Sequence, residues 1–382
     1  MQSRPVLVVG SLNMDLVVFC PRRPRPGETV TGTGFATFPG GKGANQAFSA
    51  GRLGGRVSMV GRVGDDDFGR RLTASLAGAG VDTGRVLRTP DVPTGVACIT
   101  VEEDGENSIV IVPGANGRLT PDDVERSRDL FERAGVVLLQ LEVPLETVVA
   151  AARLAHSSGA TVLLDPAPVA SGPLPGELLA AVDVLLPNQH EAAVLAGRPA
   201  PDLTTARVVA ADLLGLGPRV VVLKLGAQGA LISTGSQCDH IRGIEVPVAD
   251  TTAAGDAFAG ALAVALSEGR ELASAVAFAN RAAALSVTRR GAQPSMPLRR
   301  EVERLAAAGD RYADIRAAER RFQSAPDEQS APDEQSAPDE QSVPDEQSVP
   351  DEQSVPDGTR QPASVPSVAT ETTEQEGGDS KT

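Results

Sequence analysis

Aromatic residues and cysteines are scarce in this sequence of 382 residues, which has no Trp, one Tyr and three Cys. The cysteines, Cys20, Cys98 and Cys238, lie far apart along the chain. They therefore offer neither a disulfide framework nor the paired spacing of a structural zinc site. We expect a protein of a reducing compartment.

Long apolar runs are absent as well. No stretch approaches the roughly 18 uninterrupted apolar residues that a membrane-spanning helix needs. The apolar N-terminal stretch is interrupted by Asn13 and Asp15, and no cleavage site of small residues follows a basic start, so we read no signal peptide. These features predict a soluble, cytoplasmic protein with no membrane partner.

An excess of basic residues is also lacking. The formal net charge is −15, but residues 324–382 carry 15 of the 50 acidic residues and only 2 of the 35 basic ones, so residues 1–323 are nearly neutral. A nucleic-acid surface needs clustered Lys and Arg to replace counterions along the phosphates. The sequence therefore argues against a nucleic-acid partner.

Residues 324–382 consist of a short acidic repeat and a polar end. SAPDEQ occurs three times and SVPDEQ twice, and a Ser-, Thr-, Pro- and Glu-rich segment follows. With a proline in each unit and almost nothing apolar to bury, this segment cannot offset the entropy of ordering. We predict a disordered tail, either inert or a partner-binding or solubilising element, after a folded domain of residues 1–323.

Residues 1–323 alternate short β-branched runs with longer Ala/Leu-rich stretches. That alternation is typical of an α/β fold with a doubly wound, mostly parallel sheet covered by helices on both faces. Strands are expected at residues 6–9, 57–60, 136–141, 161–164, 184–186 and 220–223. Helices are expected at residues 147–156, 191–195, 255–266 and 272–287.

Two segments, about 15–38 and 94–112, break this rhythm. Polar and apolar positions alternate in the first, and the second reads as a β-hairpin around Asp104 and Gly105. Together they predict a small antiparallel sheet beside the main one. It would be either a lid that closes over a substrate or a plain peripheral hairpin.

Two glycine-rich segments could bind a ligand. FPGGKGAN, residues 38–45, allows a ligand to approach the backbone closely and offers Lys42 and Asn45 as hydrogen-bond donors. The alternative is a glycine-rich turn that binds no ligand. ADTTAAGDAFAG, residues 249–260, runs into a helix whose free N–H groups would bind an anion. Asp256, at the start of that helix, is either a helix cap or a general base that takes a proton from an attacking hydroxyl.

Two further segments follow predicted strands, at the edge where open α/β sheets bind ligands. LPNQHE, residues 186–191, places Asn188 and Glu191 there, and Glu191 is either a contributor to a hydrated magnesium site or a solvated residue at a helix start. KLGAQG, residues 224–229, has two glycines suited to a nucleotide. Lys42, Lys224 and Lys381 are the only lysines against 32 arginines, so two of the three lie in Gly-rich loops, where an ammonium is indicated.

The order and the residues of these motifs resemble those of the ribokinase (PfkB-type) family of sugar kinases over about residues 5–305. VVGSLNMDLV, PGETVTG, FPGGKGANQA, LLQLEVP, LDPAP, PNQHEA, DTTAAGDAFAG and VTRRGAQPSMP follow one another as in that family. Zinc catalysis and a serine hydrolase are disfavoured, because the three His have no suitable spacing and no G-x-S-x-G pattern occurs. The resemblance implies ATP-dependent phosphorylation of ribose at its 5-hydroxyl, and a homodimer formed through the β lid.

The resemblance also implies roles for individual residues. Asp256 would be the general base, and the backbone N–H groups of Ala253, Ala254, Gly255 and Asp256 the anion hole. The sugar site would comprise Asn13, Met14, Asp15, Gly41, Lys42, Gly43, Ala44, Asn45 and Glu142. The nucleotide site would comprise Asn188, Lys224, Leu225, Gly226, Ala227, Gln228, Gly229, Gly255, Asp256 and Asn280, and Glu191 would serve magnesium. An activating potassium ion would be held, mostly through main-chain oxygens, by Asp250, Thr252, Ser286, Arg289, Gly291 and Ser295.

Two departures from the family pattern and two alternatives accompany this reading. Lys224 stands where relatives often have a small polar residue, and the repeat tail has no counterpart. A kinase for a related acceptor, such as deoxyribose, fructose or adenosine, is the nearest alternative. A catalytically silent sugar-binding regulator is the other, and the retained Asp256 argues against it.

Overall fold

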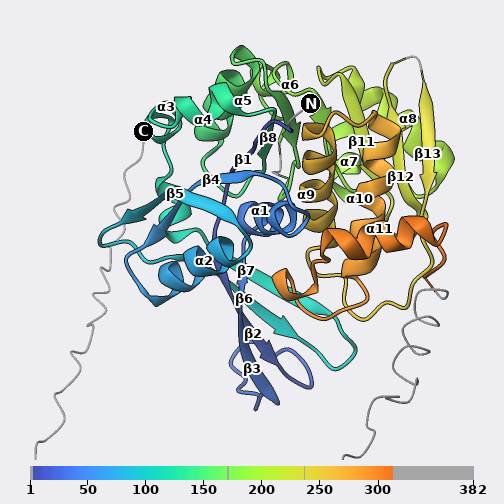
Figure 1. Cartoon of the computed structure of the whole chain (residues 1–382). Helices are drawn as coiled ribbons and strands as arrows, with labels where there is room; N and C mark the ends of the chain where they lie inside the picture. The colour runs from blue at the N-terminus through green and yellow to red at the C-terminus, as the bar shows by residue number, and fades with distance from the viewer. Residues whose placement is uncertain (1–2, 170–171, 236, 313–382) are drawn as a thin grey trace, which may run out of the picture. The chain divides into compact units, whose positions relative to one another are not determined.

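A computed structural model describes residues 3–169, 172–235 and 237–312, and the predicted tail at residues 324–382 lies outside them. A nine-stranded sheet is central to the described part, in the order β13-β12-β11-β10-β9-β8-β1-β4-β5 (Figure 1). The pairs from β11 to β5 are parallel, while β12 and β13 extend one edge antiparallel. The strands are β1 (Val6–Val9), β4 (Val57–Gly64), β5 (Val81–Thr89), β8 (Val136–Leu139), β9 (Thr161–Leu164), β10 (Val184–Leu185), β11 (Val220–Lys224), β12 (Gly229–Ser233) and β13 (Cys238–Arg242).

Helices cover both faces because the central strands are apolar on both sides. In β1, Val6 and Val8 pack into one core cluster while Leu7 and Val9 pack into the other, as the twofold periodicity of a strand requires. The first cluster includes side chains of α1 (Lys42–Arg52), α2 (Asp67–Gly78), α9 (Ala254–Ser267), α10 (Leu272–Ser286) and α11 (Arg299–Ala307). The second includes side chains of α3 (Pro121–Glu125), α4 (Arg128–Arg133), α5 (Leu145–Ser157), α6 (Gly176–Leu179), α7 (Gln189–Ala196) and α8 (Leu203–Leu214). The predicted doubly wound α/β fold is confirmed.

A four-stranded sheet lies beside the main one, in the order β3-β2-β6-β7. Its strands are β2 (Asn13–Phe19), β3 (Gly34–Gly40), β6 (Gly95–Val101) and β7 (Asn107–Val112). The two hairpins are antiparallel, as predicted, and a parallel pairing of β2 with β6 joins them. Gly105 turns the second hairpin with a φ of 88°, a conformation that glycine adopts without steric cost. We call this sheet the lid.

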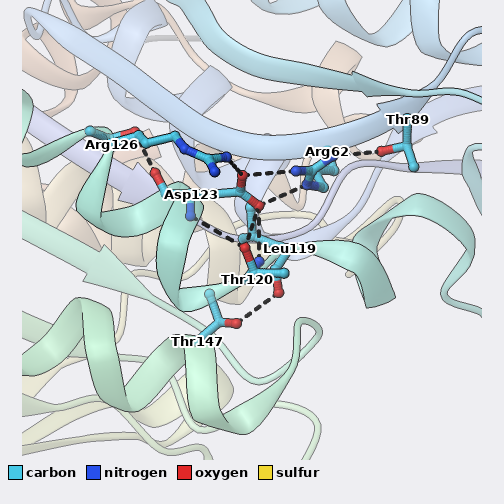
Figure 2. A network of polar contacts seen from close by, with 8 residues as sticks. Arg62, Thr89, Leu119, Thr120, Asp123, Arg126 and Thr147 are labelled. Atoms are coloured by element: carbon cyan, nitrogen blue, oxygen red, sulfur yellow. Dashed lines mark hydrogen bonds and ion pairs between the residues drawn. The ribbon is translucent and has the colours of Figure 1, made fainter.

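A polar network joins α3 to β4 and β5 of the main sheet (Figure 2). The guanidinium of Arg62 in β4 donates two hydrogen bonds of 2.8 Å to the fully buried carboxylate of Asp123. Arg62 also donates to Thr89 in β5, and Thr120 and Asp123 form a capping box at the start of α3. The network fixes the start of α3, which follows β7 and the short helix η1 (Gly114–Arg118).

Most predicted elements occur close to their expected positions, but β5, β12 and β13 of the main sheet and helices such as α2 and α8 were not predicted. Two of the predicted strands have other bounds. β4 continues to Gly64, where it pairs with β5. β8 ends at Leu139, two residues before the predicted end, because the chain turns there toward the site and buries the polar side chain of Gln140. No helix in the described part of the chain is long and apolar enough to cross a membrane.

Candidate active site

Two helix N-termini, those of α1 and α9, meet at the carboxyl end of the main sheet. Gly260 lets the two helices touch, since a Cβ on it would lie 2.5 Å from the backbone oxygen of Gln46. One turn earlier in α9, Asp256 reaches α1 and accepts hydrogen bonds of 3.0 Å from Asn45 Nδ2 and from Gln46 Nε2. The capping alternative for Asp256 is wrong, because Ala253 is the N-cap of α9 and the carboxylate is bound to α1.

Asp256 is 6 % exposed, and several neighbouring groups act on its pKa in opposite directions. Burial raises its pKa to about 6, and the charge of Asp165 acts in the same direction. Lys42 and the hydrogen bonds from Asn45 and Gln46 limit the rise. A carboxylate with a pKa near 6 is ionised at neutral pH and is a stronger base than an exposed Asp.

Glycines bring the start of α1 against the strand ends. Gly41, the N-cap, has a φ of 87°, and a Cβ on it would lie 2.6 Å from the backbone nitrogen of Asn13. A Cβ on Gly43 would lie 2.6 Å from the nitrogen of Ser11. In this tight corner Glu142 Oε2 accepts hydrogen bonds from Ser11 Oγ at 2.5 Å and from the backbone nitrogen of Lys42 at 3.0 Å.

The lid contributes two polar side chains to the same place. Asn13 is buried, and its Oδ1 accepts a 2.7 Å hydrogen bond from Asn116 of η1, which also binds the backbone of Leu12. Burial raises the pKa of Asp15 to about 7, with further contributions from the nearby charges of Glu142 and Asp256. Met14 and Ala44 differ from the other predicted sugar-site residues, because their side chains are fully buried in the core.

Lys42 is the cation of this acidic cluster. Burial alone would lower its pKa, but the charges of Asp256, Asp165, Glu142 and Glu191 outweigh burial and raise it. Lys42 therefore stays protonated, and its charge offsets part of the repulsion among the surrounding carboxylates.

Beside Asp256 lies a buried polar chain that the sequence analysis assigned no role. Gln46 Nε2 donates to Asp165 Oδ2 at 2.9 Å as well as to Asp256, and Gln46 Oε1 accepts from Gln140. The other oxygen of Asp165 accepts from Lys224 Nζ at 2.8 Å. Asp165 belongs to the LDPAP motif and Gln46 follows FPGGKGAN directly, so both lay within quoted motifs without a local feature that marked them.

The predicted anion hole is open at most of its amides. Ala253 holds a left-handed φ of 57°, and Ala254 N–H is bound to Thr251 O at 3.2 Å. In the described residues, the N–H groups of Ala253, Gly255 and Asp256 have no hydrogen-bond acceptor. These amides lie at the N-terminus of a 14-residue helix, where an anion is stabilised.

A cavity of about 470 Å³ adjoins this helix terminus. Its lining brings together six of the ten predicted nucleotide-site residues: Lys224, Gly226, Ala227, Gly229, Gly255 and Asn280. The side chain of Leu225 is instead in the core, and Gln228 is exposed outside the lining. Sequence reasoning missed the apolar wall, formed by Ile244, Val246, Val248, Phe258, Ala283, Ala284 and Val287. Asn280 holds this wall in place by donating to Arg242 O at 2.7 Å.

Asn188 and Glu191 form a capping box at the start of α7. Glu191 Oε2 and Oε1 each accept a 2.7 Å hydrogen bond from Asn188, from its backbone and side-chain nitrogens respectively. Glu191 is 6 % exposed, so it is not a solvated residue, and burial raises its pKa while Lys224 opposes the rise. Within the residues described, no cluster of three or more His, Cys, Asp or Glu side chains is arranged to hold a metal.

The residues expected around a potassium ion come from two segments, residues 250–252 and 286–295, which hydrogen bonds link. Asp250 Oδ1 accepts from Thr252 N and Oγ1, and Asp250 Oδ2 accepts from Gly291 N at 2.8 Å. Ser286 and Ser295 are buried, with their hydroxyls bound to backbone oxygens. Arg289 has no side-chain oxygen and its guanidinium forms an ion pair with Glu301, so Arg289 could contribute only a main-chain oxygen.

The comparisons with known proteins identify the family. The pfkB family of carbohydrate kinases matches residues 3–299. This chain belongs to that family. A ribokinase of Bacillus subtilis is 44 % identical over 302 residues, covering 79 % of this chain and 99 % of the relative. A deoxyribokinase of Salmonella typhi is 36 % identical over 292 residues, covering 76 % and 95 %.

Solved structures of pfkB family members agree with the fold. The structure of Arabidopsis thaliana ribokinase complexed with ribose and ATP superimposes with a TM-score of 0.74 at 36 % identity, covering 80 % of this chain and 99 % of that one. A ribokinase structure from Thermotoga maritima gives a TM-score of 0.73 at 37 % identity, covering 80 % and 99 %. As a pfkB carbohydrate kinase, this chain is an enzyme that transfers a phosphoryl group to a sugar.

Proposed function

We propose that this kinase transfers the terminal phosphoryl group of ATP to the 5-hydroxyl of D-ribose, giving D-ribose 5-phosphate and ADP. One observation carries the proposal. The buried carboxylate of Asp256 stands beside open backbone amides, between the acidic sugar corner and the cavity. A base, an anion site and room for two substrates thus meet at one point.

The sugar binds in the corner formed by Asn13, Asp15, Gly41, Lys42, Asn45 and Glu142. These groups offer both donors and acceptors to hydroxyls, as a polyol requires. Asn45 Oδ1 is buried and has no hydrogen-bond partner among the described residues, so a sugar hydroxyl that donates to it would satisfy it. Met14, Gly43 and Ala44 contribute backbone and close packing to this corner.

The reaction is an in-line displacement. Asp256 takes the proton of the 5-hydroxyl, the oxygen forms a bond to the terminal phosphorus, and the bond from that phosphorus to the bridging oxygen breaks, leaving its electron pair on ADP. The amides of Ala253, Gly255 and Asp256 stabilise the negative charge on the transferred group. Closure of the lid over the sugar excludes water, which would otherwise compete as acceptor.

The nucleotide occupies the cavity with its base against the apolar wall and its phosphates toward Gly255. Asn188 and the loop from Lys224 to Gly229 flank the phosphates. Glu191, oriented by Asn188, would hold a magnesium ion through water, because this ion keeps several waters and needs few carboxylates. Bound magnesium neutralises phosphate charge.

The loops that contain Asp250, Thr252, Ser286, Arg289, Gly291 and Ser295 would hold a potassium ion. Their donor set consists of oxygens, which suits a hard cation. The link from Asp250 to Gly291 N shows how these loops support the backbone before Ala253. The cation would act by fixing that backbone rather than by touching substrate.

We also propose a homodimer formed through the outer face of the lid, in the cytoplasm. The strand register puts Val18 opposite Phe35 and Cys98 opposite Val110, on the face opposite to Asp15. Phe35 and Val110 are each 66 % exposed, an apolar surface suited to a second copy. Cys20, Cys98 and Cys238 are free thiols, which fits a reducing compartment. We assign residues 1–323 to the kinase domain and 324–382 to a solvated tail.

The test is ADP formation from Mg-ATP with ribose, deoxyribose, fructose and adenosine, each in potassium and in a bulky organic cation. Turnover confined to ribose and raised by potassium is the expected result. Preferred turnover of deoxyribose, the substrate named for one relative, would keep the kinase and replace the sugar. Ribose binding without turnover on any acceptor would favour the silent regulator.

A further inference from the structure

Lys224 is the buried cation nearest to the proposed anion hole on the nucleotide side. It ends β11, where its backbone nitrogen donates to Pro187 O at 2.8 Å, and its side chain is 12 % exposed. A Cβ on Gly255 would lie 3.5 Å from Lys224 Nζ, and both residues line the cavity. The ammonium therefore faces the same space as the open amides at the start of α9.

The position of this ammonium is fixed by Asp165. Asp165 is 1 % exposed and follows β9, and its backbone nitrogen is bound to Leu139 O at 2.9 Å. Its Oδ1 accepts one hydrogen bond from Lys224 Nζ. An ammonium has three N–H donors, and among the described residues Asp165 is the only acceptor bound to this one. Two donors are left for a ligand in the cavity.

The chain of hydrogen bonds through Asp165 and Gln46 also determines which phosphate of the nucleotide lies nearest to Lys224. Asp165 is joined through Gln46 to Asp256, so Lys224 lies on the side of the cavity that faces this general base. The apolar wall that suits the adenine, including Val246 and Val248, belongs to the lining of the same cavity. A nucleotide in this orientation presents its last phosphate to Lys224 and Gly255.

We infer that Lys224, held by Asp165, binds the terminal phosphoryl group of ATP and stays with it during transfer; this inference rests on the proposed kinase reaction. The ammonium offsets the charge that spreads over the phosphoryl oxygens in the transition state. Asp165 is a positioning residue that acts through Lys224. Gln46 keeps the carboxylates of Asp165 and Asp256 at a fixed separation. The group that binds the phosphoryl and the general base therefore keep the same relative position.

The test compares nucleotides with and without the terminal phosphate. Lys224→Met in the full chain removes the charge and keeps the volume, and Arg219→Met removes an exposed cation just before the other end of β11 as a control. Isothermal titration measures the affinity for ADP and for a non-hydrolysable ATP analogue, each with magnesium. A hydrogen bond to a charged group is worth about 1.5–3 kcal/mol. Lys224→Met should therefore lower the affinity for the ATP analogue about 10- to 100-fold and the affinity for ADP far less. It should also lower kcat.

Other outcomes are equally informative. Equal weakening of both nucleotides would place Lys224 on the inner phosphates or in a structural role, and unchanged affinities would remove it from the site. Thermal unfolding of Lys224→Met shows whether this variant folds. If it does not, Lys224→Ala is measured instead, with ethylammonium added to supply the missing charge. We expect the added ethylammonium to restore turnover, and a failure to restore it would count against the assignment. If Lys224→Met weakens binding of the ATP analogue selectively while the wild-type chain does not phosphorylate ribose, the proposed sugar is refuted and the Lys224 assignment stands.

Discussion

Gln46 donates a hydrogen bond of 3.0 Å to Oδ1 of Asp256, and the same nitrogen donates to Asp165 at 2.9 Å. One amide group thus bridges two buried carboxylates on different elements. Because Gln46 Oε1 accepts from Gln140, the amide cannot flip without losing its partners. The base is thereby held in one orientation before substrate binds.

The pH dependence of turnover should report Asp256. Burial raises its pKa to about 6, and only the ionised form can accept the proton. We expect kcat/KM for ribose to be level above that pH and to fall about tenfold per unit below it. Asp15→Asn, which removes the group with a pKa of about 7, should keep the inflection near 6. A flat profile between pH 5 and 8 would exclude Asp256 as the titrating base.

The close approach of α1 to the strand ends can be tested by adding one methyl group. Gly43→Ala puts a Cβ 2.6 Å from Ser11 N, so α1 must move and the sugar corner with it. We expect a loss of about 1–3 kcal/mol in stability and at least a tenfold loss in ribose affinity. The helical control Gly78→Ala meets nothing within 4 Å and should leave both the melting temperature and ribose affinity unchanged or slightly improved. Equal behaviour of the two variants would refute the packing argument.

The buried ion pair between Arg62 of β4 and Asp123 of α3 should be costly to break. Asp123→Ala leaves Arg62 without its buried partner, and we expect the free energy of unfolding in urea to fall by about 3–5 kcal/mol. The exposed pair of Arg198 with Asp212 is the control, and Asp212→Ala should cost less than about 1 kcal/mol.

The same ion pair should weaken in acid. Burial opposes ionisation of Asp123, but hydrogen bonds from Arg62 and Thr120 outweigh it and lower its pKa. The stabilisation is therefore present above the ordinary Asp range and is lost as pH falls through the lowered value. The difference in unfolding free energy between wild type and Asp123→Ala should shrink accordingly; a difference independent of pH would contradict this.

The outer face of the lid should carry the dimer contact. Val110→Glu places a charge on an apolar surface, whereas Val208→Glu, exposed on α8, changes an unrelated surface. Light scattering after size exclusion should give a dimer for wild type and Val208→Glu and a monomer for Val110→Glu. A monomeric wild type, or a dimeric Val110→Glu, would argue against this interface.

Much of the fold could be predicted because apolar runs mark the buried strands directly. Runs such as residues 6–9 and 161–164 matched β1 and β9, while β5 at one edge of the sheet and β12 and β13 at the other were not predicted. Local sequence also placed the glycine-rich corner and the start of α9. Contacts over about 210 residues, such as Gln46 with Asp256, leave no mark in local spacing. The cavity wall was missed for a similar reason, since Val246 and Ala283 meet only when the chain folds.

The most direct test of the central claim is a comparison of wild type with Asp256→Asn, measuring kcat for ribose phosphorylation and ribose affinity by titration. Removing a general base typically costs about 10²- to 10⁴-fold in rate. We predict a fall of that size in kcat with ribose affinity retained within a few fold, because other side chains hold most of the sugar. Near-normal turnover in Asp256→Asn would contradict the assignment of Asp256 as the base.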